Sequence, residues 1–126
     1  MVTASDADFA TTVGRLEAAT ARNFNVAAKV DHAAGAVKIE ESLRPTTLLV
    51  FGNPTVGTAM MQSSQTFGLD LPLKASVHED AEGQIQVATA SISALAEWHG
   101  VDNPSEVERV AGVLAEIAAE AAGSGQ

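Results

Sequence analysis

The clearest pattern in the chain is an alternation of apolar and polar residues in several short stretches. Apolar residues at every second position over 24–30, 71–77 and 85–87 predict strands with one buried face. The stretch 46–51 is β-branched or apolar at successive positions and therefore apolar on both faces, which is typical of a central strand. We therefore expect a sheet of four strands.

A second pattern has the spacing of helices. Apolar residues recur every three or four positions over 9–20 and again over 107–121, which predicts helices at about 6–22 and 104–122. Shorter helices are predicted at 32–43, 54–65 and 93–99. Asn53-Pro54 and Asn103-Pro104 each combine a capping residue with a proline at the first helical position. Ser5 and Asp8 have the spacing of a capping box for the first helix.

The order of these elements predicts the fold class. Strands separated by helix-containing connections are usually parallel, and the last two strands are close enough to form an antiparallel hairpin. Because three of the strands have one polar face, we expect the helices on one face of the sheet only. The prediction is an α/β fold, with α+β as the alternative, built as a two-layer sandwich on a mixed four-stranded sheet. We expect one globular domain over 1–122 and a frayed tail over 123–126.

The central strand also predicts a partner surface. Leu49 and Phe51 lie on one side of it, and Leu48 and Val50 lie on the other. An apolar stripe on an uncovered sheet face indicates an interaction site, for which a homodimer is the simplest partner. The alternative is a loop or terminal segment of the same chain lying over that face.

Composition narrows the class of protein. The chain has 126 residues, a net charge of −9 and no cysteine. An acidic protein of this kind lacks the basic patches that bind nucleic acid or anionic membranes, and thiol chemistry is excluded. The sequence has no signal-peptide pattern and no apolar run long enough to cross a bilayer. We expect a soluble, cytoplasmic protein with no membrane or nucleic-acid partner.

Candidate chemistry gathers where the predicted strands end. The carboxyl ends of parallel strands meet at one rim of a sheet, which is where ligands bind in open α/β sheets. The free N–H groups of Thr55, Val56 and Gly57 at the start of a helix would attract a small anionic ligand. The candidate ligand-binding residues are Asp31, His32, Asn53, Thr55, Gly57, His78 and Glu79. The alternative for Asn53 is that it only caps its own helix.

No recognised metal-binding spacing is present, and we expect neither a metal nor a cofactor. His99 is expected at the surface near a helix end. Arg44 and Asn53 are at opposite ends of one strand, so Arg44 is expected to form a local pair, with Asp70 as the candidate partner, or to reach another subunit.

Several short segments follow one another in a distinctive order: Val-Asp-His-Ala-Ala-Gly-Ala (30–36), Leu-Arg-Pro (43–45), Val-Phe-Gly-Asn-Pro (50–54), Gly-Thr (57–58), Leu-Asp-Leu-Pro-Leu (69–73) and Glu-Asp-Ala-Glu-Gly (79–83), with Met61. This set of segments resembles domain-of-unknown-function family 302. The resemblance covers about residues 9–100. It implies a compact α/β domain, often dimeric, with no settled activity. The sequence departs from the family pattern at Gln86 and Thr89, where aromatic residues are expected, and at Trp98, where a basic residue is expected.

Two functions follow from the sequence. The first is a dimeric binding module or subunit with a small-ligand or protein site at the rim. The alternative is a small enzyme in which His32 is the general acid or base, with the helix start stabilising an oxyanion. No nucleophile elbow, phosphate loop or dinucleotide fingerprint supports the enzyme.

Overall fold

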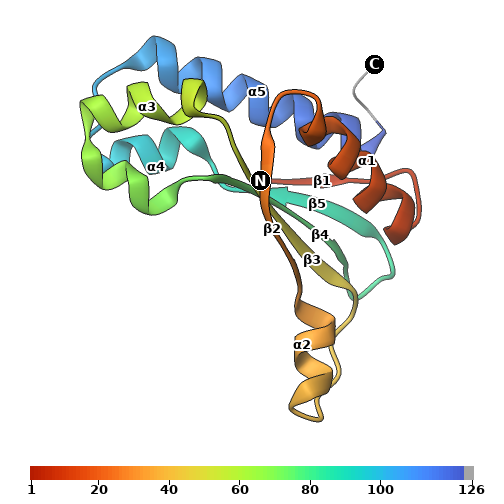
Figure 1. Ribbon diagram of the computed structural model, residues 1–126. Helices are drawn as coiled ribbons and strands as arrows, with labels where there is room; N and C mark the ends of the chain where they lie inside the picture. The colour runs from red at the N-terminus through yellow and green to blue at the C-terminus, as the bar shows by residue number, and fades with distance from the viewer. Residues whose placement is uncertain (124–126) are drawn as a thin grey trace.

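The computed structural model describes residues 1–123, which form a five-stranded sheet with helices (Figure 1). The strands are β1 (Val2–Ala4), β2 (Asn25–Asp31), β3 (Thr46–Gly52), β4 (Leu73–Glu79) and β5 (Ile85–Thr89). The helices are α1 (Phe9–Ala21), α2 (His32–Lys38), α3 (Pro54–Ser63), α4 (Ile92–His99) and α5 (Pro104–Ala122), and a 3-10 helix, η1, spans Gln65–Asp70. The strand order is β1-β5-β4-β3-β2. Most of the tail predicted to fray, 124–126, lies outside the described residues.

The predicted α/β class and the helical layer on one side of the sheet are confirmed (Figure 1). Two features of the sheet differ from the prediction. Within residues 1–123 it has five strands rather than four, and all neighbouring strands are antiparallel rather than mixed. The additional strand, β1, has three residues and pairs with β5. Three residues are too few for an alternation of apolar and polar positions to be recognised in a sequence.

The antiparallel pairing of β2 with β3 has a simple geometric cause. A parallel connection must return the chain along the full length of the strand, which is about 23 Å for seven residues. Helix α2 has seven residues and spans only about 10 Å. It has no buried residue, so it does not pack across the sheet either. The segment therefore forms a long hairpin with a helix at its tip.

The core lies on one face of the sheet. Thr47, Leu49 and Phe51 alternate as buried residues of β3, and Phe51 is 0% exposed. Helices α1 and α5 cover this face and pack against each other. Leu48 and Val50 point to the opposite face and are only partly covered. β3 lies between β2 and β4, as predicted for a central strand, and the side of it that carries Leu48 and Val50 stays partly exposed in the single chain.

Two predicted helix starts are confirmed and two are displaced. The side chains of Asn53 and Asn103 accept hydrogen bonds from Thr55 N and Glu106 N, as capping residues do. Helix α1 is capped by Asp8 instead of Ser5, whose hydroxyl is buried and bonds Thr12 at 2.6 Å. Helix α4 is predicted to start at Ser93, but it begins at Ile92 and is capped by Ser91.

Residues 25–45 form an arm that projects from the body of the molecule (Figure 1). All seven residues of β2 are exposed, and α2 has no buried residue. Large apolar side chains are nevertheless frequent on the arm. Those exposed by more than a third are Val26, Val30, Val37, Ile39 and Leu43. The arm thus combines an apolar surface with very little coverage from its own chain.

Asn53→Ala should lower the free energy of unfolding by about 1–2 kcal/mol. Besides capping α3, Asn53 donates from Nδ2 to the carbonyl of Asn23 at 2.7 Å and so joins α3 to the start of β2. Asn103→Ala is the matched control, because Asn103 caps α5 without a comparable bond to a distant segment. Chemical denaturation measures both variants, and an unchanged midpoint for Asn53→Ala would contradict the capping role.

Candidate functional site

The antiparallel strands separate the seven predicted site residues into two groups at opposite ends of the sheet. One group comprises Asp31, His32, His78 and Glu79, and the other comprises Asn53, Thr55 and Gly57. The pairing shows this directly, because Asp31 lies opposite Thr47 at the start of β3, whereas Asn53 follows the end of β3 roughly 20 Å away. The predicted shared rim is therefore wrong, since it required parallel strands.

The group around His32 has the features of a structural turn. The Asp31 side chain accepts from Ala34 N at 2.9 Å and caps α2. His32 is exposed, and within residues 1–123 it has no hydrogen bond to a carboxylate or hydroxyl and lines none of the cavities described. Arg44 donates to the backbone carbonyl of Glu79 at 3.1 Å, so the predicted pair with Asp70 is wrong. This end of the sheet gives no support to His32 as an acid or base.

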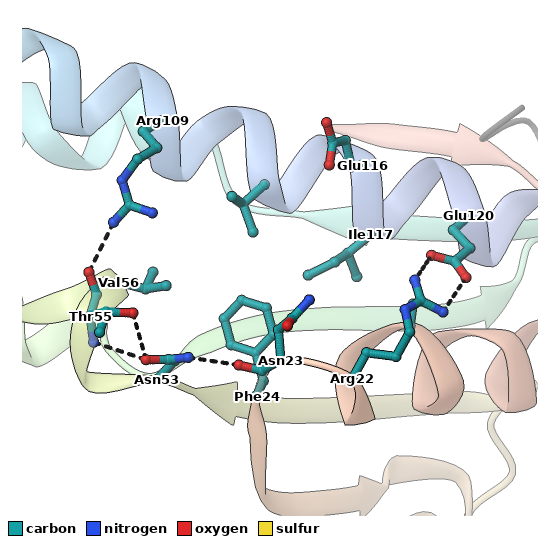
Figure 2. Close-up of a pocket in the computed structure, with 12 residues that line it drawn as sticks. Arg22, Asn23, Phe24, Asn53, Thr55, Val56, Arg109, Glu116, Ile117 and Glu120 are labelled. Carbon is teal, nitrogen blue, oxygen red and sulfur yellow. Dashed lines mark hydrogen bonds and ion pairs between the residues drawn. The ribbon is translucent and has the colours of Figure 1, made fainter.

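Asn53 and Thr55 of the other group border a cavity of about 350 Å³ between α5 and the segments that end α1, begin β2 and begin α3 (Figure 2). We call it the α5 cavity. Its charged lining residues are Arg22, Arg109, Glu116 and Glu120. Its large apolar lining residues are Phe24, Val56, Val113 and Ile117. Asn23, Asn53 and Thr55 complete the polar lining. Charged groups thus surround an apolar floor.

Asn53 is fixed at the edge of the α5 cavity. Its side-chain oxygen accepts from both Thr55 N, at 2.9 Å, and Thr55 Oγ1, at 2.7 Å. Its amide nitrogen donates to Asn23 (Figure 2). The N–H of Val56 donates to the Asn53 carbonyl at 2.8 Å. Two of the three N–H groups expected to attract an anion are therefore already bonded, and Asn53 itself is largely committed to holding the cavity wall.

Arg109 is the cationic group best placed to meet a ligand. Its Nη2 donates to the Thr55 carbonyl at 2.9 Å, and Nε and Nη2 both bond the Glu106 carboxylate. The hydrogen bond from Arg109 lowers the pKa of Glu106 and raises that of Arg109, so both groups stay charged. The remaining nitrogen, Nη1, points into the cavity (Figure 2).

The opposite end of the α5 cavity is closed by an ion pair between distant parts of the chain. Arg22, just after α1, donates to both carboxylate oxygens of Glu120 on α5, with Nη1 at 2.8 Å from Oε1 (Figure 2). A two-point pairing of this kind fixes the orientation of both groups. These bonds lower the pKa of Glu120 and raise that of Arg22.

The lining charges of the α5 cavity balance. Arg22 and Arg109 are offset by Glu116 and Glu120, and Glu116 makes no ion pair or hydrogen bond within residues 1–123. A ligand with both a negative group and a hydrogen-bond donor matches this arrangement better than a multiply charged anion. The sequence contained a signal for one wall, because Arg109, Val113, Glu116 and Glu120 recur at the spacing of one helix face.

Gly57 lies on the far side of α3 from the α5 cavity, and its role is packing. A Cβ atom at this position would come within 2.9 Å of Leu71 Cδ1. Gly57 is buried and lines a second, apolar cavity of about 400 Å³ with Met61, Leu71 and Leu73. The space beside Gly57 is therefore occupied by the side chain of Leu71.

The family model described as domain of unknown function DUF302 matches residues 1–122. The chain belongs to this family. The crystal structure of an uncharacterized conserved DUF302 protein from Bacillus stearothermophilus has a TM-score of 0.80, covering 100% of this chain and 97% of that chain at 16% sequence identity. At this identity the likeness establishes the fold alone.

Two curated relatives carry the name of a transport protein. The fluoride-specific ion channel FluC 1 of Brucella suis biovar 1 (strain 1330) is 40% identical over 99 residues, which are 78% of this chain and 39% of that protein. FluC 2 of Brucella melitensis biotype 1 has the same identity over 99 residues, covering 37% of its length. This DUF302 chain thus spans about two-fifths of the curated relatives that it matches, and none of its described helices is long and apolar enough to cross a bilayer.

The Arg22–Glu120 pair predicts a small pH dependence of stability. A carboxylate with a lower pKa in the folded state adds stability above its unfolded pKa, about 4.3, and loses it as pH falls through the folded value. In Arg22→Gln the pKa of Glu120 should rise, and the loss of stability at acid pH should become smaller. The change should be small because both side chains are exposed. NMR titration of the Glu120 carboxyl group tests this. Arg15→Gln, which removes the separate Arg15–Asp6 pair, should leave Glu120 unchanged.

Proposed function

We propose that this DUF302 chain is a dimeric binding module that holds a small polar molecule in the α5 cavity. The observation that carries the proposal is the uncommitted Nη1 of Arg109 above an apolar floor, with the free carboxylate of Glu116 two helical turns away on the same wall. Pockets of this kind combine apolar surface with a few oriented polar groups. The side chains of Asn53 and Arg109 are held in place by several hydrogen bonds each, so the wall is formed before a ligand arrives.

The chemistry of the walls selects a ligand with separated charges. A ligand carboxylate would accept from Arg109, and a ligand ammonium group would pair with Glu116. The apolar part of the ligand would cover Val56 and Ile117. A small amino acid with an apolar side chain has these three properties and fits a volume of about 350 Å³. A small anion, as expected from the sequence, satisfies Arg109 but leaves Glu116 unpaired.

The dimer is supported by two apolar surfaces that the chain itself does not cover. One is the open face of the sheet, where Leu48 and Val50 lie beside Val30 of the neighbouring strand. The other is the arm, with exposed Val37 and Ile39 near its tip. A two-fold axis that lays the arm of one copy on the open face of the other would cover both surfaces at once.

Charge complementarity favours a second copy as the occupant. The tip of the arm carries Glu40 and Glu41. The open face of β4 carries Lys74 and His78, which alternate with the buried residues of that strand. Pairing of Glu40 or Glu41 with Lys74 of the second copy would aid association in a chain whose net charge of −9 otherwise opposes it.

The ligand proposal is tested by NMR titration with L-leucine, succinate and sodium fluoride as separate probes. L-leucine should shift the amide signals of Thr55, Val56 and Ile117. Arg109→Gln should weaken its binding at least tenfold, a loss of about 1.4 kcal/mol. The matched control is Arg44→Gln, since Arg44 lies at the other end of the sheet and should have no effect. Unshifted signals with both organic probes would refute this ligand class.

The likeness to the FluC proteins favours a second candidate, a module that binds fluoride beside a channel. The same titration separates the two candidates. Shifts produced by sodium fluoride but not by sodium chloride, in the absence of any response to L-leucine, would favour this second candidate over the first.

The dimer is tested by sedimentation at micromolar concentration. The wild-type protein should sediment as a dimer, and Ile39→Glu should sediment as a monomer with an unchanged melting temperature, because Ile39 is 72% exposed in the single chain. Leu69→Glu is the matched control, since Leu69 is 82% exposed but lies in η1, away from the arm. A monomeric wild-type protein would refute the proposal.

A further inference from the structure

A hydrogen-bonded polar cluster outside the α5 cavity is centred on His99 at the end of α4. The His99 side chain is only 5% exposed, so the prediction of a surface histidine is wrong. Its Nε2 lies 2.5 Å from Oδ2 of Asp70, and its Nδ1 lies 2.9 Å from Oγ1 of Thr66. The ring also makes an edge contact with Phe67, with centroids 5.4 Å apart. Both ring nitrogens and one ring edge are therefore fixed by η1.

The partners of His99 determine its tautomer. An ionised carboxylate can only accept hydrogen bonds, so the proton of the neutral ring is on Nε2, facing Asp70. Nδ1 then carries a lone pair, and the Thr66 hydroxyl donates to it. The Thr66 oxygen in turn can accept from the Ser64 hydroxyl at 3.1 Å. A threonine hydroxyl that donates to an imidazole oriented by a carboxylate has the arrangement of an activated nucleophile.

We propose that Thr66 is an activated hydroxyl that accepts acyl groups from small activated esters. His99 acts as the base, and Asp70 is the positioning residue that holds the ring and stabilises its protonated form. The site is independent of the α5 cavity, whose lining includes none of these three residues. Thr66 is exposed although most of the His99 ring is covered, so a small ester can reach the hydroxyl that is hydrogen-bonded to Nδ1.

The reaction balances without any further reagent. Thr66 Oγ1 attacks the acyl carbon of the ester, and its proton passes to His99 Nδ1. The new bond joins Oγ1 to the acyl carbon, the bond from that carbon to the leaving oxygen breaks, and the proton passes from Nδ1 to the leaving group. Asp70 remains ionised throughout and offsets the positive charge of the imidazolium.

A purely structural role for the cluster makes a different prediction. The contacts of His99 join the end of α4 to η1, and a network with only that purpose would stabilise the fold without changing the reactivity of Thr66. Thr58 provides the comparison inside the same molecule. It is exposed on α3 and has no hydrogen-bonded base within residues 1–123. The ratio of the acylation rates of Thr66 and Thr58 separates the two roles.

The experiment treats the wild-type protein with p-nitrophenyl acetate and follows acetylation of each threonine by peptide mass mapping. Thr66 should react about a hundredfold faster than Thr58, as expected for general-base assistance. Equal rates for the two threonines, or no acetylation of Thr66, would overturn the proposal. This comparison requires no variant and does not depend on any variant's folding.

Variants then assign the roles of the three residues. Asp70→Asn should reduce acetylation of Thr66 at least tenfold and leave that of Thr58 unchanged, because an amide can donate to Nε2 and reverse the tautomer. His99→Gln should reduce the Thr66 rate to that of Thr58. Thr66→Ser should retain fast acetylation at position 66. An undiminished Thr66 rate in correctly folded Asp70→Asn, shown by an unchanged circular dichroism spectrum, would refute the relay.

Discussion

The inner face of β3 is the constraint on which the rest of the structure depends. Thr47, Leu49 and Phe51 are buried beneath the helical layer, and β3 pairs with β2 on one side and β4 on the other. Because side chains alternate between faces, a shift of one residue in β3 would turn these side chains outward and bring Leu48 and Val50 inward. The register of the neighbouring strands, and with it the position of Asn53 at the end of β3, is fixed by this burial. Phe24 adds an edge contact to Phe51, with centroids 5.3 Å apart, which anchors the chain just before β2.

The sequence specified most of the elements because their signals are local. Alternation revealed β2, β4 and β5, a continuous apolar run revealed β3, and Asn-Pro pairs marked the starts of α3 and α5. Strand direction is not a local property. A helix between two strands can cross the sheet and join parallel strands, or it can lie at the tip of a hairpin and join antiparallel ones. Only the packing of the helix distinguishes these two cases. A short helix would have favoured the hairpin, but the helix predicted from the sequence extended to residue 43. In the structure α2 ends at Lys38, which is too short for the chain to return along β2 and start a parallel strand.

The site was harder to predict because its parts meet only in three dimensions. Arg22 and Glu120 are 98 positions apart, and Arg109 reaches Thr55 over 54 positions. No spacing rule connects such residues. The burial of His99 could not be predicted for the same reason. A histidine near the end of a helix is expected to be exposed to solvent, and its burial against Phe67 follows from the position of η1. The wall on α5 is the exception, because its charged and apolar residues recur on one helix face.

The α5 cavity and the arm meet at the start of β2, and this links the two halves of the proposed function. Asn23 and Phe24 line the cavity immediately before β2, and β2 is the first segment of the arm. Among the strands of residues 1–123, β2 pairs with β3 alone, and its register shifts at a bulge between Val26 and Ala28. Under the proposed function, a ligand that holds Asn23 and Phe24 in one arrangement would favour one position of the arm. Because coupling between two binding equilibria is reciprocal, a ligand that tightens the dimer must itself bind the dimer more tightly, by the same factor.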